Sequence, residues 1–211
     1  MSKLWKLLTR GDNRNYALVS SGTQYIDTGV KAASDLRIIA DIETGNPVSG
    51  VTVVIFGSRD TNTPTNAVTI FSNVSATSNG RSDYATGAAN TIAIPRTQIP
   101  FNTNMTIDKN RNQTFINGVL VANHGTASFI GNSNITLFAV NTGGVISMHC
   151  SFKMKACKIY SNDTLVRDFV PVPAGSTRFS GFSAPSNCLW DKVTQAYFQN
   201  AGTGSFGIET V

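Results

Sequence analysis

Apolar and polar residues alternate along much of this chain with a period of two, the spacing of a β-strand. Over residues 36–43, apolar side chains alternate with a face that includes Arg37, Asp41 and Glu43. Because successive side chains of a strand point to opposite faces, this pattern predicts a half-buried strand. A nearly continuous apolar run over residues 51–57 predicts a central strand covered on both faces.

Residues 114–121 give the strongest local prediction. Two alternating apolar runs flank Asn117 and Gly118. An Asn-Gly pair in this position selects a two-residue type I′ turn, whose backbone twist matches that of the flanking strands. The segment therefore predicts a β-hairpin.

Similar runs, separated by turn residues, predict the rest of the fold. Strands are expected over residues 16–19, 24–29, 67–74, 135–140, 158–160, 165–171 and 189–191. Residues 75–82 are expected to form a loop, residues 161–163 a turn, and residues 200–206 the glycine-rich close of a short hairpin. No helix longer than a turn or two is indicated. Short strands broken by frequent turns predict an all-β fold, a two-sheet antiparallel sandwich.

The segment 147–160 changes phase. Alternate positions from 148 to 156 place their apolar side chains on one face, and then Cys157 and Ile159 fall on the other. Two explanations stay open: a β-bulge shifts the register near Ala156, or the strand becomes covered on both sides.

Composition favours a single domain with a neutral polar surface. The chain has 211 residues, of which 14% are charged, against about 25% in an ordinary soluble domain. The net charge is +5, but the basic residues are mostly dispersed. No recognition helix or stacking platform is visible, so a protein or glycan partner is favoured over nucleic acid.

Residues 1–15 stand apart as a basic N-terminal arm, before a domain over 16–211. They carry an excess of basic residues, with leucines at a spacing suited to one or two helical turns. An aromatic anchor beside cations is a common way to fasten a small segment. We therefore expect Trp5, Lys6, Leu7 and Arg10 to dock onto a partner protein.

The cysteines and the apolar runs bear on the cellular compartment. Cys150 and Cys157 fall on opposite faces of the predicted strand, so three buried free thiols are favoured, with a disulfide from Cys188 to one of them left open. The run at 4–8 is too short for a signal peptide, and no stretch approaches the roughly 18 apolar residues of a membrane span. Synthesis in a cytosol without a membrane anchor is expected.

Several segments, taken in order, resemble a known family. They are residues 24–29, 55–59, 108–110 with 115–118, 137–139, and the series from 158 to 206. Together they look like the concanavalin A-like, laminin-G-like jelly-roll proteins common in bacteriophage genomes. The resemblance implies two packed antiparallel sheets in a virion part such as a head decoration, fibre tip or tail adhesin. Relatives outside phages bind glycans, glycosaminoglycans or proteins, sometimes through calcium.

Some distant relatives with this fold are glucanases, which makes Asp41 and Glu43 the best catalytic candidates. Residues i and i+2 of a strand share a face roughly 7 Å apart, close to the spacing of a glycosidase carboxylate pair. The glucanase pattern places a third acid two residues before Asp41, where this chain has Ile39. An exposed acidic face is therefore favoured over an active site.

Other candidate residues give weaker indications. His124 and His149 have no locally arranged acid or serine, and together with the cysteines they lack zinc-ligand spacing. Arg167, beside Asp168, is expected to point outward or to pair with a carboxylate across the sandwich. Trp190 is expected in the core.

Loop tips would have to supply any glycan or calcium site. Arg59, Asp60 and Asn141 are the glycan-contact candidates. No calcium-binding motif supports a cofactor, and none is expected.

These observations lead to an expected function. The chain is expected to be a non-enzymatic structural protein of a tailed-phage virion, in a head decoration or a fibre. It would be made in the host bacterial cytoplasm, displayed on the virion surface, homo-oligomeric, and bound to capsid or fibre proteins. The alternative is a glycan-binding adhesin that contacts the host surface.

Overall fold

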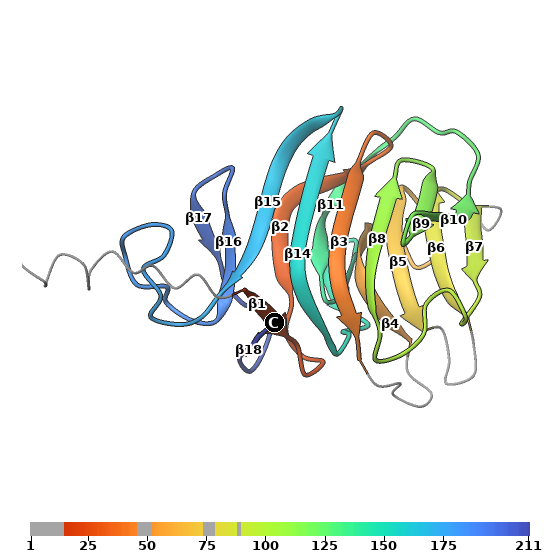
Figure 1. Ribbon diagram of the computed structural model, residues 1–211. Coiled ribbons are helices and arrows are strands. Elements are labelled where there is room, and N and C mark those ends of the chain that lie inside the picture. Colours follow the sequence, from red (N-terminus) through yellow and green to blue (C-terminus); the bar gives the residue numbers. More distant parts are fainter. Residues whose placement is uncertain (1–14, 46–51, 74–78, 88–89) are drawn as a thin grey trace, which may run out of the picture.

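A computed structural model describes residues 15–45, 52–73, 79–87 and 90–211, which form two β-sheets packed face to face (Figure 1). Sheet A contains β1 (Tyr16–Val19), β3 (Arg37–Thr44), β8 (Asn104–Asn110), β9 (Gln113–Ile116), β10 (Val119–Asn123), β14 (Phe152–Ser161), β15 (Thr164–Val172), β16 (Cys188–Asp191), β17 (Ala196–Phe198) and β18 (Gly207–Thr210). Sheet B contains β2 (Ile26–Ala33), β4 (Val53–Arg59), β5 (Ala67–Asn73), β6 (Gly80–Ala85), β7 (Thr91–Ile94), β11 (Ile130–Leu137), β12 (Val140–Thr142) and β13 (Val145–Ser147).

Strand pairing follows a simple order in each sheet. Sheet A runs β10-β9-β8-β3-β14-β15-β16-β17, and β1 joins the N-terminal part of β14 with β18 beside it. Sheet B runs β13-β12-β4-β5-β6-β7, and β11 links β2 to β4. The pairings are antiparallel, except that β12 runs parallel to β4. The predicted all-β, two-sheet antiparallel sandwich is confirmed.

The main hydrophobic core lies between the sheets, and β3 shows why. Ile38, Ala40 and Ile42 are buried in this core, while Asp41 and Glu43 lie on the outer face of sheet A. The alternation read from residues 36–43 therefore predicts both faces correctly. The apolar run at 51–57 corresponds to β4, which is buried at every position.

Two tight turns follow the sequence prediction. Asn117 and Gly118, between β9 and β10, have φ values of 50° and 79°, as a type I′ turn requires. Asn162 and Asp163, between β14 and β15, have φ values of 46° and 61°. The predicted hairpin at 114–121 and the predicted turn at 161–163 are both confirmed.

The phase change in segment 147–160 is a β-bulge. The register of β14 against β3 shifts between Met154 and Ala156, so Lys155 is the extra residue. Cys157 and Ile159 then enter the core. The first of the two open explanations is correct.

The prediction of one strand over the whole of 147–160 is wrong. Strand β13 ends at Ser147 in sheet B, and β14 begins at Phe152 in sheet A. Met148 has a φ of 53°, which breaks the extended backbone where the chain crosses between the sheets.

Two further predictions need correction. Residues 75–82 are not all loop, because β6 begins at Gly80 and carries a polar, inward-facing serine at position 82. Residues 135–140 are not one strand: β11 ends at Leu137, Phe138 has a φ of 70°, and β12 starts at Val140. The pattern of apolar and polar residues does not reveal a residue with left-handed backbone conformation between two apolar runs, so this break could not be predicted.

The N-terminal boundary of the sandwich lies where the first strand begins, at Tyr16. The proposed docking residues Trp5, Lys6, Leu7 and Arg10 lie outside the described residues. Within the part of the chain that is described, no helix has the length and apolar character needed to cross a membrane.

Candidate functional site

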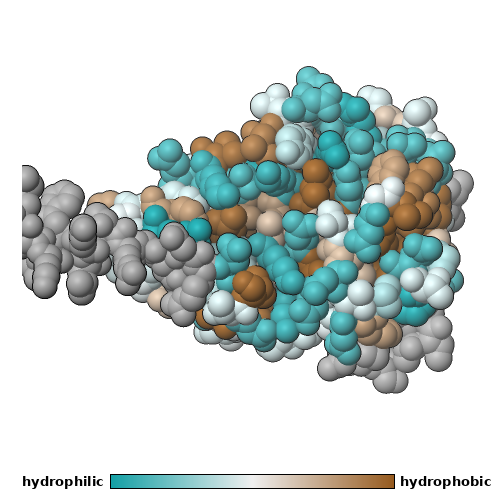
Figure 2. All heavy atoms as spheres, viewed as in Figure 1, coloured by the Kyte–Doolittle hydropathy of each residue, from teal (hydrophilic) through white to brown (hydrophobic). Residues whose placement is uncertain are grey.

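A groove of about 450 Å³ opens on the outer face of sheet A, and we call it the outer groove. Figure 2 views this side of the molecule, where hydrophilic residues are interleaved with apolar ones. The groove is lined by Asn15, Tyr16, Asp41, Lys155, Ala156, Val170, Pro171, Arg178, Phe179, Lys192 and Val211. Its volume lies within the range of about 300–1,000 Å³ that is typical of small-molecule sites.

The bulge in β14 shapes one wall of the outer groove. Without it, successive residues would point to opposite faces; with it, Lys155 and Ala156 both line the groove. The Lys155 Nζ atom donates a hydrogen bond to Asn104 Oδ1 at 2.6 Å. No described carboxylate lies within ion-pair distance of Lys155, so its charge is available to a ligand.

The opposite wall of the outer groove is aromatic. Phe179 belongs to the connection between β15 and β16, and its ring lies parallel to that of Trp190 at 5.8 Å, with 8° between the planes. Trp190 also packs edge-on against Tyr197 at 4.8 Å. The buried Trp190 belongs to a small second core on this side of β16, as predicted for a core residue. It holds Phe179 in place as a wall of the groove.

Positive side chains predominate in the outer groove. Lys155, Arg178 and Lys192 come from three separate segments, and Asp41 is the one carboxylate side chain among the lining residues. Asp41 Oδ1 accepts a hydrogen bond from Thr106 Oγ1 at 2.6 Å. Lys192 lies 3.8 Å from Asp168, at the limit of an ion pair, and is half exposed. Cationic side chains thus outnumber carboxylate side chains in the lining of the groove.

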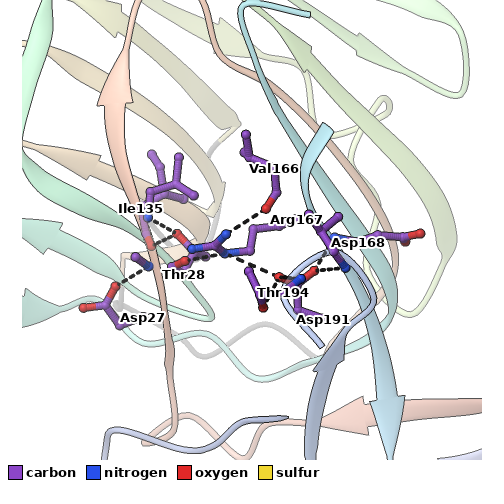
Figure 3. Close-up of polar contacts among 11 residues, drawn as sticks. Asp27, Thr28, Ile135, Val166, Arg167, Asp168, Asp191 and Thr194 are labelled. Atoms are coloured by element: carbon purple, nitrogen blue, oxygen red, sulfur yellow. Dashed lines mark hydrogen bonds and ion pairs between the residues drawn. The ribbon is translucent and has the colours of Figure 1, made fainter. Parts of the chain in front are cut away.

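A second polar network, shown in Figure 3, ties sheet A to sheet B. Arg167 of β15 donates from Nε to the carbonyl oxygen of Thr28 in β2, at 2.9 Å. The same Nε lies 3.7 Å from Asp191 Oδ2, and Asp191 is fully buried. Asp191 also accepts hydrogen bonds from the backbone N–H of Asp168 at 2.7 Å and from Thr194 Oγ1 at 2.7 Å.

This network corrects the prediction for Arg167. The side chain does not point outward, and its carboxylate partner Asp191 belongs to the same sheet. The contact across the sandwich is with a backbone carbonyl of β2 instead. The network fixes β15 against the opposite sheet, which is a structural role.

The proposed glycan residues lie together, on the other sheet from the outer groove. Arg59 ends β4 and is 3% exposed, and its Nε donates to Thr142 Oγ1 at 3.0 Å. Asp60 accepts hydrogen bonds from the backbone N–H of Asn132 at 2.8 Å and from Asn66 Nδ2 at 2.9 Å. Asn141 is 7% exposed, and its Oδ1 accepts from the Gly144 N–H at 2.9 Å. Their polar atoms thus serve internal bonds that hold the loops at this end.

The candidate catalytic acids lie on an open sheet face. Glu43 forms an ion pair with Lys153 at 3.0 Å, and Asp41 lies in the outer groove. His149 lies beside the ring of Tyr25, with 6.1 Å between the ring centroids. Among the described residues, no acid and histidine side chains are joined by an ion pair or a hydrogen bond as a catalytic pair would be.

The cysteines are all buried and free, as favoured from the sequence. Burial raises the pKa of the Cys150 thiol to about 12 and that of the Cys188 thiol to about 11. Burial also raises the pKa of Cys157. Thiols in this state are poor nucleophiles near neutral pH.

A buried polar cluster inside the sandwich escaped the sequence analysis. Lys109 is fully buried, and its Nζ atom has no hydrogen-bond partner among the described residues. Nearby, Ser82 Oγ lies 2.9 Å from both Thr114 Oγ1 and His124 Nε2. The sequence does indicate that Lys109 is buried, because the alternation of β8 places it on the same face as Met105 and Ile107.

Burial shifts the titration of two members of this cluster. It lowers the pKa of Lys109 from 10.5 to about 7, opposed by the charge of Asp83. It also lowers the pKa of His124 from 6.5 to about 4, aided by the nearby positive charge of Lys109. Burial therefore shifts the titration of both side chains toward the neutral form.

The described ranges contain no group of three or more His, Cys, Asp or Glu side chains placed to hold a metal ion. No family model matches the chain, and no curated protein matches it.

Proposed function

We propose that this chain is a non-enzymatic structural protein of a tailed-phage virion, displayed on the head or on a fibre. The sequence resemblance suggests this setting. The observation that supports a contact role over a catalytic one is the composition of the outer groove. Its lining has one carboxylate side chain, Asp41, whereas glycoside hydrolysis requires a pair.

The side chains that could take part in catalysis are either paired with other residues or buried, which further supports a contact role. Glu43 is paired with Lys153, His124 with Ser82, and the three thiols are buried. A protein of this kind acts through surfaces that neighbouring molecules can reach.

Incorporation into particles tests the virion proposal. Docking by Trp5, Lys6, Leu7 and Arg10 predicts that deletion of residues 1–14 removes the protein from purified particles, while the truncated domain still folds. Wild-type occupancy of the truncated protein would contradict docking through the arm. Quantitative mass spectrometry of the particles gives the occupancy.

Self-association is proposed through the open edge of β10. Val119 is 54% exposed and Leu120 is 47% exposed. This edge strand has neither a charged residue nor a proline, which are two of the features by which exposed edges avoid pairing. Its register against β9 shifts between Leu120 and Ala122, next to the exposed pair. A second copy presents the same edge, and antiparallel pairing would satisfy both.

The outer groove favours a second candidate function, that of a glycan-binding adhesin. An aromatic ring beside hydrogen-bonding side chains is a suitable surface for a sugar ring, and Phe179 is held in that position by Trp190. Saturable binding on a carbohydrate array, weakened by Phe179→Ala, tests this candidate. If Phe179→Ala leaves glycan binding unchanged, the outer groove is not the glycan-binding site.

A further inference from the structure

We propose that a buried cluster between the two sheets binds an internal water molecule, held by Lys109 Nζ and His124 Nδ1. The inner cluster consists of Ser82 and Tyr84 of β6, Lys109 of β8, Thr114 of β9, and His124, which follows β10. It is separate from the outer groove and from the surfaces proposed for docking.

The first argument is that two nitrogen atoms of the inner cluster have no hydrogen-bond partner. Lys109 Nζ and His124 Nδ1 are both buried, and neither has a partner among the described residues. The Lys109 side chain is fully buried, because β8 directs it to the same face as Met105 and Ile107. A buried polar atom without a partner loses its hydration and gains no bond in return. Such atoms are the usual partners of internal water.

The second argument is that the two nitrogen atoms belong to side chains that surround one aromatic ring. Lys109 Nζ lies 4.9 Å from the centroid of the Tyr84 ring, and the centroid of the His124 ring lies 5.9 Å from it. The Tyr84 hydroxyl group donates to the carbonyl oxygen of Ser34 at 3.0 Å instead of to this cluster. The positive charge of Lys109 also lowers the pKa of His124, as expected for neighbouring groups. A single site beside the Tyr84 ring is therefore close to both side chains.

The third argument is that water completes a chain of hydrogen bonds in the inner cluster. Ser82 Oγ lies 2.9 Å from Thr114 Oγ1 and 2.9 Å from His124 Nε2. When Nε2 carries the imidazole proton, it donates to Ser82, Ser82 donates to Thr114, and Nδ1 is left as an acceptor. A water molecule accepts a hydrogen bond from Lys109 and donates one to Nδ1. The proposal therefore includes the Nε2–H tautomer of His124.

Water suits the inner cluster better than an ion does. A halide ion would accept a hydrogen bond from Lys109, but it would have to leave bulk water for an enclosed site, at a large desolvation cost. The charge of Lys109 is also partly balanced by Asp83, so an anion has less to gain there. Water is neutral, and it both accepts and donates hydrogen bonds.

The backbone of Asn90 provides the competing arrangement. It acts on the imidazole in the direction that raises the pKa of His124. An Nδ1–H tautomer directed at this backbone would turn Nδ1 into a donor, and Nε2 would then accept from Ser82. Lys109 and His124 would not share a water molecule as donor and acceptor. The tautomer of His124 therefore distinguishes the two arrangements.

Crystal structures of the full-length wild-type chain and of Lys109→Met test the site. Both crystals are grown in bromide, whose anomalous scattering separates a halide from water. We expect wild-type density for a water about 3 Å from both Lys109 Nζ and His124 Nδ1, without anomalous signal, and its loss in Lys109→Met. Lys158→Met is the matched control, because Lys158 is an exposed lysine of β14, and the water should be retained.

Nitrogen-15 NMR of His124 in the wild-type protein tests the same arrangement in solution, and it does not depend on the folding of any variant. We expect the Nε2–H tautomer at pH 7. The Nδ1–H tautomer would overturn the shared site.

The crystallographic outcomes separate water from the alternatives. An anomalous peak beside Lys109 would overturn water as the ligand and assign the site to an anion. The absence of an ordered atom between the two nitrogens, or a water retained unchanged in Lys109→Met, would overturn the site itself.

Discussion

Lys109 of β8 and Tyr84 of β6 meet inside the sandwich, with the Lys109 Nζ atom 4.9 Å from the centroid of the Tyr84 ring. The two residues belong to opposite sheets. The aromatic face is a favourable partner for this amine, which lacks a hydrogen-bond acceptor among the described residues. An ionisable group in this position makes the stability of the fold depend on pH.

Lys109→Met is predicted to stabilise the protein most below pH 7. The folded pKa of Lys109, about 7, lies below its ordinary value of 10.5. Between these values the unfolded chain binds more protons, so wild-type stability rises with pH across this window, by roughly 3 to 5 kcal/mol in the limit. Urea unfolding from pH 6 to 10 should show the advantage of Lys109→Met shrinking as pH rises. A constant difference would show that Lys109 titrates normally.

His124→Asn is predicted to reduce the sensitivity of the fold to acid. The folded pKa of His124, about 4, lies below its ordinary value of 6.5. Stability from this group is therefore complete above pH 6.5 and is lost as pH falls toward 4. Asn can still bond to Ser82 but does not titrate. Thermal unfolding at pH 5 and pH 7 should show a smaller loss in the variant, and an equal loss in both proteins would contradict this account.

Asp191→Asn is predicted to lower the free energy of unfolding by about 3 kcal/mol. The carboxylate is fully buried, pairs with Arg167 and accepts hydrogen bonds from the backbone, and an amide nitrogen cannot replace it as an acceptor. Asp163→Asn is the matched control, because Asp163 is exposed in its pair with Arg111 and Asn tolerates the same turn. Chemical denaturation measures both. Comparable effects at the two positions would refute a structural role for the buried network.

Leu120→Lys is predicted to shift the protein toward the monomer. A charge on the open edge of β10 opposes pairing with a second copy. Val145→Lys is the control, since Val145 is also an exposed aliphatic residue but lies in sheet B. Analytical ultracentrifugation over a range of concentrations gives the association constant. Unchanged association in Leu120→Lys would place the contact elsewhere.

The parts of the fold that are determined by residues close together in the sequence could be predicted. The alternation of β3 and the Asn117-Gly118 turn act over a few residues, and both were predicted correctly. The crossing from sheet B to sheet A near Met148 was not, because the apolar alternation continues through it while the backbone does not.

The candidate site was predictable only in fragments. The phase change near Ala156 indicated a bulge, but nothing local indicated that Lys155 would lie near Asp41 and Lys192. No sequence pattern predicted that Arg59, Asp60 and Asn141 would lie near one another. In the folded chain, their side chains form internal hydrogen bonds that hold loops. Convergence of distant segments is a property of the topology, and short-range patterns do not encode it.

The central claim is that this sandwich serves as an exposed contact surface of a virion. Quantitative mass spectrometry of purified intact phage particles, combined with antibody labelling of their surface, tests this proposal most directly. The account predicts a fixed copy number per particle and labelling without disruption of the particle. Absence of the chain from particles, with the protein found only in the lysate, would contradict it.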